Sequence, residues 1–223
     1  MDYRNECKHA LNYLDYLVLR QRLRAVMEPD PHAGPDGRYF IRSLYFDDLR
    51  DTALMEKLDG VNKRDKFRIR FYDHDTSVIH LEKKSKINGL CAKRVASIGR
   101  GQAEAILAGD WEWMPHTKDP LLTEFYTRLK AGLLPRAVVD YTREPFVYAP
   151  GNVRVTLDYD IRTGAEPARF LQEDCVTLPI GGNAYLLEVK WDAFLPSFIR
   201  DAVQMTGRHT ASFSKYAACR IYG

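Results

Sequence analysis

Alternating polar and apolar positions mark eight stretches of this sequence. In residues 63–72 every even position from 64 to 70 is lysine or arginine, whereas positions 67, 69 and 71 are phenylalanine or isoleucine. Successive side chains of a strand point to opposite faces, so this period of two predicts a strand with one cationic and one apolar face. Similar alternation predicts strands at residues 3–8, 38–46, 63–72, 78–84, 92–96, 136–146, 153–161 and 184–191.

Apolar residues three or four positions apart predict helices between and after these strands. In residues 120–131 leucine or phenylalanine recurs at 121, 125 and 129, and Asp119 followed by Pro120 suits an N-cap with proline at the first helical position. The other predicted helices cover residues 11–27, 49–58, 102–108, 195–205 and 214–221.

The order of these elements predicts an α+β fold. Eight strands are enough to close a barrel with a side-chain-lined interior. Amphipathic helices need an apolar surface to pack on, and the apolar strand faces offer one. We therefore expect an eight-stranded antiparallel β-barrel tunnel with a charged lumen and helices packed outside. No repeat or long linker divides the chain, so we expect a single domain over residues 1–223.

The charge of the strands suggests an anionic ligand. One cationic strand alone is typical of an ordinary strand with its polar face in solvent, but neighbouring strands also carry charged faces. Glu6 and Lys8 share a face, as do Glu82 and Lys84. Like charges at about 4 Å repel by about 4 kcal/mol at an effective dielectric constant of about 20. Nearby carboxylates offset part of this repulsion, and a bound anion would offset more.

The composition excludes several classes of protein. A formal net charge of +3 is too small to drive nucleic-acid binding by itself, and the enclosed cations of alternating strands argue against it as well. No apolar run approaches the roughly 20 residues of a membrane span, and the charged N-terminus leads into no apolar segment of the signal-peptide type, so we expect a cytoplasmic protein. The four cysteines form no C-x-x-C pair, and no P-loop motif occurs.

The charged strands carry the motifs of a known family. In chain order these are R-x-E-x-K at 4–8, S-L-Y-F-D at 43–47, K-F-R-I-R-F-Y at 66–72, L-E-K-K at 81–84, Y-T-R-E-P-F at 141–146, R-V-T-L-D at 154–158, L-E-V-K at 187–190 and S-F-S-K-Y at 212–216. Together they resemble the VTC domain, the polyphosphate polymerase branch of the triphosphate tunnel metalloenzyme (CYTH-like) superfamily. The resemblance implies an eight-stranded antiparallel tunnel that binds triphosphate or polyphosphate with a divalent metal, Mn²⁺ or Mg²⁺.

The resemblance also implies roles for individual residues. The implied phosphate contacts are Lys8, Arg68, Arg70, Lys83, Lys84, Lys93, Arg143, Arg154, Lys190 and Lys215. The implied metal ligand is Glu188, supported by Glu6 and Glu82, and the implied catalytic residues are Lys8, Arg68, Arg70, Glu188 and Lys215. Two choices stay open. Strand alternation places Lys84 on the face of Glu82, whereas the family alignment indicates Lys83, and either Lys93 or Arg94 could face the tunnel.

The first strand departs from the superfamily pattern. Arg4 stands where the superfamily often has the first acid of E-x-E-x-K. The VTC branch tends to carry a basic residue there. Because one metal ligand is missing, the departure weakens the interpretation as a two-metal triphosphatase.

These observations lead to one expected activity and two alternatives. We expect transfer of the γ-phosphoryl group of ATP to a growing polyphosphate chain, a reaction that depends on positioning and on charge stabilisation. Arginine forks bind phosphate bidentately, and a divalent cation on Glu188 would bridge phosphate oxygens. The alternatives are hydrolysis of tripolyphosphate or a nucleoside triphosphate, and a non-catalytic module that holds polyphosphate. In any of these roles a membrane protein is a possible partner.

Overall fold

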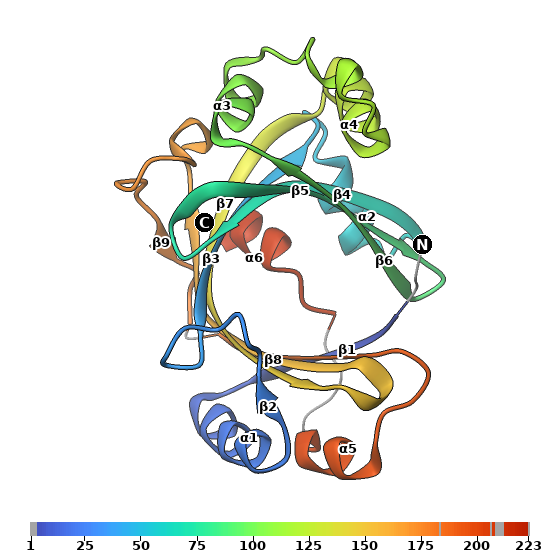
Figure 1. Ribbon diagram of the computed structural model, residues 1–223, viewed down its shortest axis with the longest axis vertical. Helices are drawn as coiled ribbons and strands as arrows, with labels where there is room; N and C mark the ends of the chain where they lie inside the picture. Colours follow the sequence, from blue (N-terminus) through green and yellow to red (C-terminus); the bar gives the residue numbers. More distant parts are fainter. Residues whose placement is uncertain (1–3, 183, 206, 208–211, 223) are drawn as a thin grey trace.

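The computed structural model describes residues 4–182, 184–205, 207 and 212–222. In this part of the chain, ten strands form one antiparallel sheet and six α-helices accompany it (Figure 1). The long strands are β1 (Asn5–Leu11), β3 (Tyr39–Asp47), β4 (Lys63–Tyr72), β5 (Asp75–Ile87), β6 (Leu90–Ile98), β7 (Leu134–Tyr148), β8 (Val153–Gly164) and β10 (Tyr185–Trp191). The helices are α1 (Tyr13–Val26), α2 (Thr52–Leu58), α3 (Arg100–Ala108), α4 (Pro120–Lys130), α5 (Ser197–Val203) and α6 (Lys215–Tyr222).

The α+β fold class and each predicted strand and helix are confirmed. The strand order is β1-β10-β8-β7-β3-β4-β5-β6, and the two-residue strands β2 (Glu28–Pro29) and β9 (Leu178–Pro179) pair with β7 and β8. The predicted start of α4 is also present. The Asp119 side chain accepts a hydrogen bond from the backbone N–H of Leu121 at 2.7 Å, and Pro120 is the first helical residue.

The sheet curves strongly, but a closed barrel is not confirmed. Its edge strands β1 and β6 come together on one side of the molecule (Figure 1). Among the described residues a single bridge joins the two edges, with the N–H of Arg4 donating to the carbonyl of Cys91 at 3.1 Å. Beyond this bridge side chains span the gap, because the Lys84 amine donates to Glu6 at 3.0 Å. Side-chain contacts therefore replace a backbone ladder along this seam.

Helices α3 and α4 cover the outer face of the wall formed by β3 to β6. Phe125 of α4 packs against Phe46 and Phe67, with ring centroids 5.0 and 5.4 Å apart. Ile106 of α3 joins the same buried cluster. Burial of each such side chain contributes roughly 1.5–3 kcal/mol. The apolar face of the cationic strand β4 is thus turned outward, so its charged face is turned inward.

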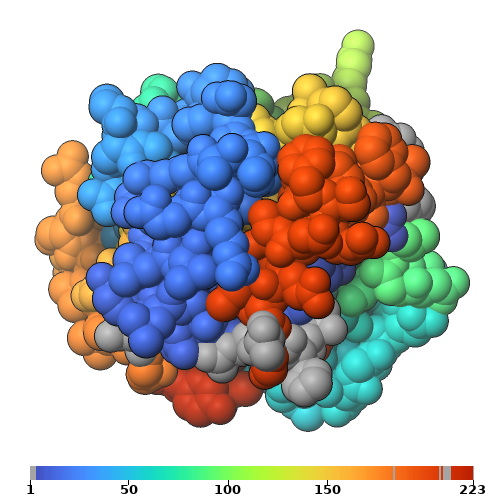
Figure 2. All heavy atoms as spheres, turned by 90° about the horizontal axis from the view of Figure 1, so that it is seen from below, coloured from blue at the N-terminus to red at the C-terminus, as the bar shows by residue number. Residues whose placement is uncertain are grey.

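Helices α1 and α5 lie side by side over the opposite wall (Figure 2). Leu19 and Leu23 of α1 and Ile199 of α5 are fully buried in one cluster with Val155 and Leu187 of the strands beneath. The period of two then turns the intervening charged residues of β8 and β10 toward the inside of the sheet. Both walls therefore present charged faces to a common interior.

The prediction that all helices lie outside the sheet is wrong for α6. This helix packs against the concave face, where Tyr216 and Ala217 share a buried cluster with Tyr45 and Val139 (Figure 1). The small side chains of residues 217–219 allow close approach to the strands, and the Tyr216 hydroxyl donates to buried Asp47 at 2.7 Å. No helix within the described ranges is long and apolar enough to cross a membrane.

Candidate functional site

A cavity of about 710 Å³ opens on the concave face of the sheet. Among the described residues, fourteen lysine or arginine side chains line it, against three carboxylates, Glu6, Asp158 and Glu188. The residues implied as site residues that line it are Lys8, Arg68, Arg70, Lys84, Lys93, Arg143, Arg154, Lys190, Lys215, Glu6 and Glu188. The structure therefore brings most of the expected site together in one cationic space.

Two arginines of β4 are fixed in one wall of the cavity. Arg68 donates from Nε to Glu82 at 2.7 Å and from Nη1 to the Tyr45 hydroxyl at 2.6 Å. Arg70, which is buried, donates to the Tyr141 hydroxyl at 3.0 Å. Burial alone would raise the pKa of Glu82, yet Arg68 and Arg70 hold that pKa well below its ordinary value. The carboxylate is thus permanently charged and holds both guanidinium groups in place before any ligand arrives.

A second charged cluster joins β7, β8 and α6. Arg143 donates two hydrogen bonds to Asp158, from Nε at 2.6 Å and from Nη2 at 2.8 Å, and the Lys215 amine also contacts this carboxylate. Burial would raise the pKa of Asp158, but Arg143 and Lys215 lower it to about 2. Lys215 is the first residue of α6, so the inward position of this helix supplies a cation to the cavity.

A third cluster lies where β1 pairs with β10. The Lys190 amine is 2.9 Å from Glu188 and 3.6 Å from Glu6, and the Lys8 amine is 3.7 Å from Glu188. Burial would raise the pKa of Glu188, yet Lys190 and Lys8 hold it well below the ordinary value. For Lys8, burial would lower the pKa, whereas Glu188 and Glu6 raise it. Lys8 therefore stays charged inside the protein.

The carboxylates fit a metal site only if phosphate completes it. In the described part of the chain no group of three or more His, Cys, Asp or Glu side chains could hold a metal ion. Glu188 and Glu6 nevertheless lie close enough to share the Lys190 amine. Mg²⁺ commonly uses one or two carboxylates together with substrate phosphates and water. Glu82 does not belong to this pair, because its oxygens accept from Arg68 and Lys93.

The implied phosphate contact Lys83 lies outside the cavity, which corrects the family alignment. Its amine is 2.6 Å from Glu124 and 2.9 Å from Asp65, on the outer face of β5. Arg94 contacts Glu124 on the same side at 2.8 Å. Lys84 and Lys93 line the cavity instead. The physical reason is the strand period of two, which turns neighbouring residues to opposite faces.

Arg154 stands at another part of the lining. Its Nη2 is 2.8 Å from Asp30 and donates to the Tyr39 hydroxyl at 2.6 Å.

Sequence reasoning assigned no role to several other lining residues, namely Lys57, Lys86, Tyr39, Tyr72 and Tyr141. Lys86 continues the even-numbered charged face of β5, so the alternation already pointed to it. Lys57 comes from α2, and no local pattern indicates where that helix sits relative to the sheet.

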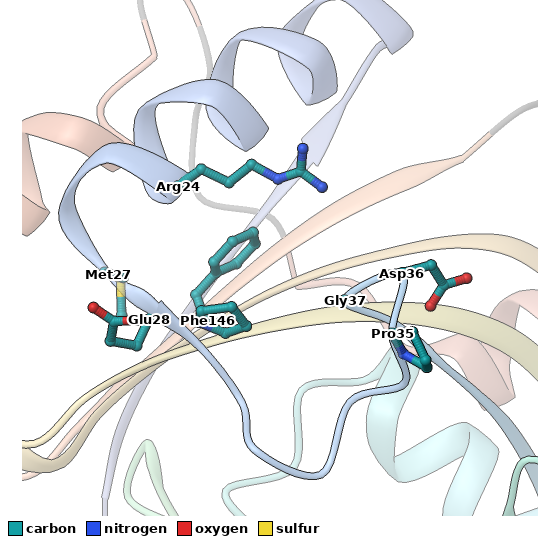
Figure 3. Close-up of a pocket in the computed structure, with 8 residues that line it drawn as sticks. Arg24, Met27, Glu28, Pro35, Asp36, Gly37 and Phe146 are labelled. Atoms are coloured by element: carbon teal, nitrogen blue, oxygen red, sulfur yellow. The ribbon is translucent and has the colours of Figure 1, made fainter.

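A smaller hollow of about 330 Å³ lies outside the sheet, near the end of α1 (Figure 3). Arg24, Met27 and Glu28 line one side and Asp36 the other, with Phe146 between them. The hollow has one arginine and two carboxylates and lacks the concentration of cations found in the large cavity. The candidate site is therefore the cavity within the sheet.

Comparison with protein-family models matches the VTC domain over residues 3–221. The chain belongs to the VTC domain family. The matched residues include the strands of both cavity walls, because the match extends from before β1 to within α6. A search of the curated proteins finds no match.

A solved structure shares the fold of this VTC domain. A Bacillus halodurans protein provisionally assigned as an adenylate cyclase aligns with a TM-score of 0.51 and 13% identity, covering 85% of this chain and 80% of that one. The PH1012 protein of Pyrococcus horikoshii aligns with a TM-score of 0.47 and 13% identity, covering 90% and 85% of the two chains. At such identity the first likeness shows a common fold, and the second, below a TM-score of 0.5, carries no argument.

Proposed function

We propose that this VTC domain binds triphosphate or polyphosphate in its cationic cavity and transfers the γ-phosphoryl group of ATP to a polyphosphate chain. The observation that carries the proposal is the imbalance of charge in the cavity, where the described residues contribute fourteen lysine or arginine side chains and three carboxylates. A polyphosphate anion carries charge along its whole length. It is therefore the class of ligand that neutralises a lining of this kind.

The arginines suit the binding and orientation of phosphate groups. Arg68, Arg70 and Arg143 are held by Glu82, by tyrosine hydroxyls and by Asp158, so their positions are set before the ligand binds. Fixed donors that face a developing negative charge stabilise a phosphoryl-transfer transition state without reorganisation. Lys8 and Lys215 add point charges that phosphate oxygens can approach from several directions.

Glu188 and Glu6 are the residues that would hold Mn²⁺ or Mg²⁺, with phosphate oxygens completing the coordination. A divalent cation bound there would withdraw charge from the phosphate oxygens. The Glu188 carboxylate remains ionised, because Lys190 and Lys8 keep its pKa low. The protein thus places two carboxyl groups beside the cations that would bind phosphate.

A second candidate function is a module that binds polyphosphate without chemical turnover. It is favoured by the small number of acids, because the described residues hold no cluster of three potential metal ligands. Hydrolysis of tripolyphosphate or a nucleoside triphosphate is a third reaction compatible with the same lining. These activities differ in their products.

Incubation of the purified protein with ATP and Mn²⁺ tests the proposal. We expect long-chain polyphosphate on a gel, with matching consumption of ATP, and loss of polymer formation in Glu188→Gln. Release of phosphate without polymer would identify a hydrolase instead. Tight binding of polyphosphate, with ATP intact and Glu188→Gln without effect, would identify a binding module.

A further inference from the structure

One part of the cavity is lined by cations that have no carboxylate partner among the described residues. Among the residues that the structure describes, no Asp or Glu oxygen lies within ion-pair distance of Lys57, Arg64, Lys66 or Lys86. The hydrogen bonds of Lys57, Arg64 and Lys66 have neutral acceptors. The Lys57 amine donates to the carbonyl and hydroxyl of Ser212 at 2.8 and 2.7 Å, and the Lys66 amine to the Ser214 hydroxyl at 3.3 Å.

These cations also face one another across the sheet. Arg64 lies opposite Lys86 in the β4–β5 pair, and Lys66 lies opposite Lys84. Like charges directly opposite each other destabilise an antiparallel pair. Lys84 is compensated, because Glu6 contacts it at 3.0 Å. Arg64, Lys66 and Lys86 have no such contact with a carboxylate of the described residues, and only the more distant Asp47 offsets part of the repulsion at Lys66. Positive charge is therefore in excess in this part of the lining.

Lys66 shows the consequence for a single group. Burial, with Lys57 and Arg64 nearby, lowers the pKa of its amine to about 7. The aromatic ring of Tyr216, 5.1 Å from the amine, offers weak compensation. Desolvated amines and guanidinium groups that repel one another destabilise the folded protein. A bound anion is the partner that would make this arrangement favourable.

We propose that Lys57, Arg64, Lys66 and Lys86 form a second anion subsite, which binds the phosphates of a chain longer than tripolyphosphate. The inference rests on the proposed function, since it assumes that the first phosphates lie around Arg68. A strand rises about 3.3 Å per residue, which places Arg64 about 13 Å along β4 from Arg68. The subsite thus extends the phosphate path along the strand and selects polyphosphate over tripolyphosphate or a nucleoside triphosphate.

Calorimetric titration with tripolyphosphate and with long-chain polyphosphate tests the subsite. In the variant Arg64→Ala/Lys86→Ala we expect affinity for long-chain polyphosphate to fall at least tenfold and affinity for tripolyphosphate to change less than twofold. The control variant Lys63→Ala/Lys130→Ala removes the same charge from exposed positions that do not line the cavity. It should bind both anions within twofold of the wild type.

The other possible binding results would contradict either the subsite or the proposed function. Equal weakening for both anions would show a general effect of charge and overturn the subsite, as would unchanged binding of long-chain polyphosphate. A wild-type protein that binds neither anion would refute the proposed function itself, which separates the two failures. The variant should melt no lower than the wild type, because it removes unpaired like charges. Arg64→Gln/Lys86→Gln repeats the comparison with polar side chains of greater length.

Discussion

Replacement of Lys66 by methionine should stabilise the folded protein while weakening its hold on polyphosphate. Methionine keeps an unbranched side chain and removes the ammonium group, which is half-buried and has no carboxylate within ion-pair distance among the described residues. The charged or titratable groups that face Lys66 are Lys57 on α2, Arg64 on β4, Lys84 on β5, Asp47 on β3 and Tyr216 on α6. Positive charge predominates among them.

The size of the gain follows from the pKa. Burial, then Lys57 and Arg64, lower the pKa of Lys66 from 10.5 to about 7. Each unit is worth about 1.4 kcal/mol, so the charge opposes folding by up to about 5 kcal/mol below pH 7. Water reaches the half-buried amine, so we expect a gain in the free energy of unfolding of about 2 kcal/mol for Lys66→Met at pH 7.

The gain must also depend on pH. Between pH 7 and 10.5 the unfolded chain binds the Lys66 proton more tightly than the folded chain does, so this residue makes wild-type stability rise with pH. The advantage of Lys66→Met should therefore shrink toward pH 10.5. At pH 8, polyphosphate binding should draw a proton onto wild-type Lys66, and Lys66→Arg should bind without this uptake.

Urea denaturation at pH 7 and pH 9.5 measures these effects, with Lys63→Met as the control on the exposed end of the same strand. We expect the control to change stability little at either pH. A destabilised Lys66→Met variant would show that the Lys66 charge does not oppose folding. So would a gain that is the same at both pH values, because desolvation of a charge would then not be its source.

Neighbouring lysines provide a matched test of the cavity. In calorimetry, Lys84→Ala should weaken polyphosphate binding about fivefold, or about 1 kcal/mol. Lys83→Ala makes the same change of charge outside the cavity and should leave polyphosphate binding unchanged. Arg143→Ala should lower the free energy of unfolding by about 3 kcal/mol, because it strands the buried carboxylate of Asp158, and equal denaturation midpoints would contradict this. The pKa of Asp158 lies at about 2, below its ordinary 3.8. The ionised Asp158 carboxylate therefore adds up to about 2 kcal/mol to the free energy of unfolding above pH 4, and this contribution is lost as the pH falls through 2. Acid denaturation of Asp158→Asn should lack this component, and curves that coincide with the wild type would argue against the ion pair.

The period of two was sufficient to predict which strand faces turn inward. It placed Arg68 and Arg70 on the face of β4 that points away from its apolar residues. It also distinguished Lys84, which lines the cavity, from Lys83, which the family alignment indicated. This succeeds because side-chain alternation is a local property of an extended chain. The predicted start of α4 at Asp119 is local for the same reason.

Features that depend on contacts distant in the sequence were not predictable in the same way. The inward position of α6 follows from its fit against β3 and β7, and its sequence is as amphipathic as that of an outer helix. The seam between β1 and β6 depends on the curvature of the whole sheet. The sequence also did not predict that Glu82 holds cations of the lining in place, since only the folded chain brings Arg68 and Lys93 to its two oxygens.

A crystal structure of the protein soaked with tripolyphosphate and Mn²⁺ would show where the anion binds. We expect phosphate groups inside the cavity, in contact with Arg68, Arg143 and Lys215, and a metal ion beside Glu188. A cavity without phosphate in the soaked crystal, or phosphate bound only on the outer surface beside residues such as Lys83, would contradict this expectation.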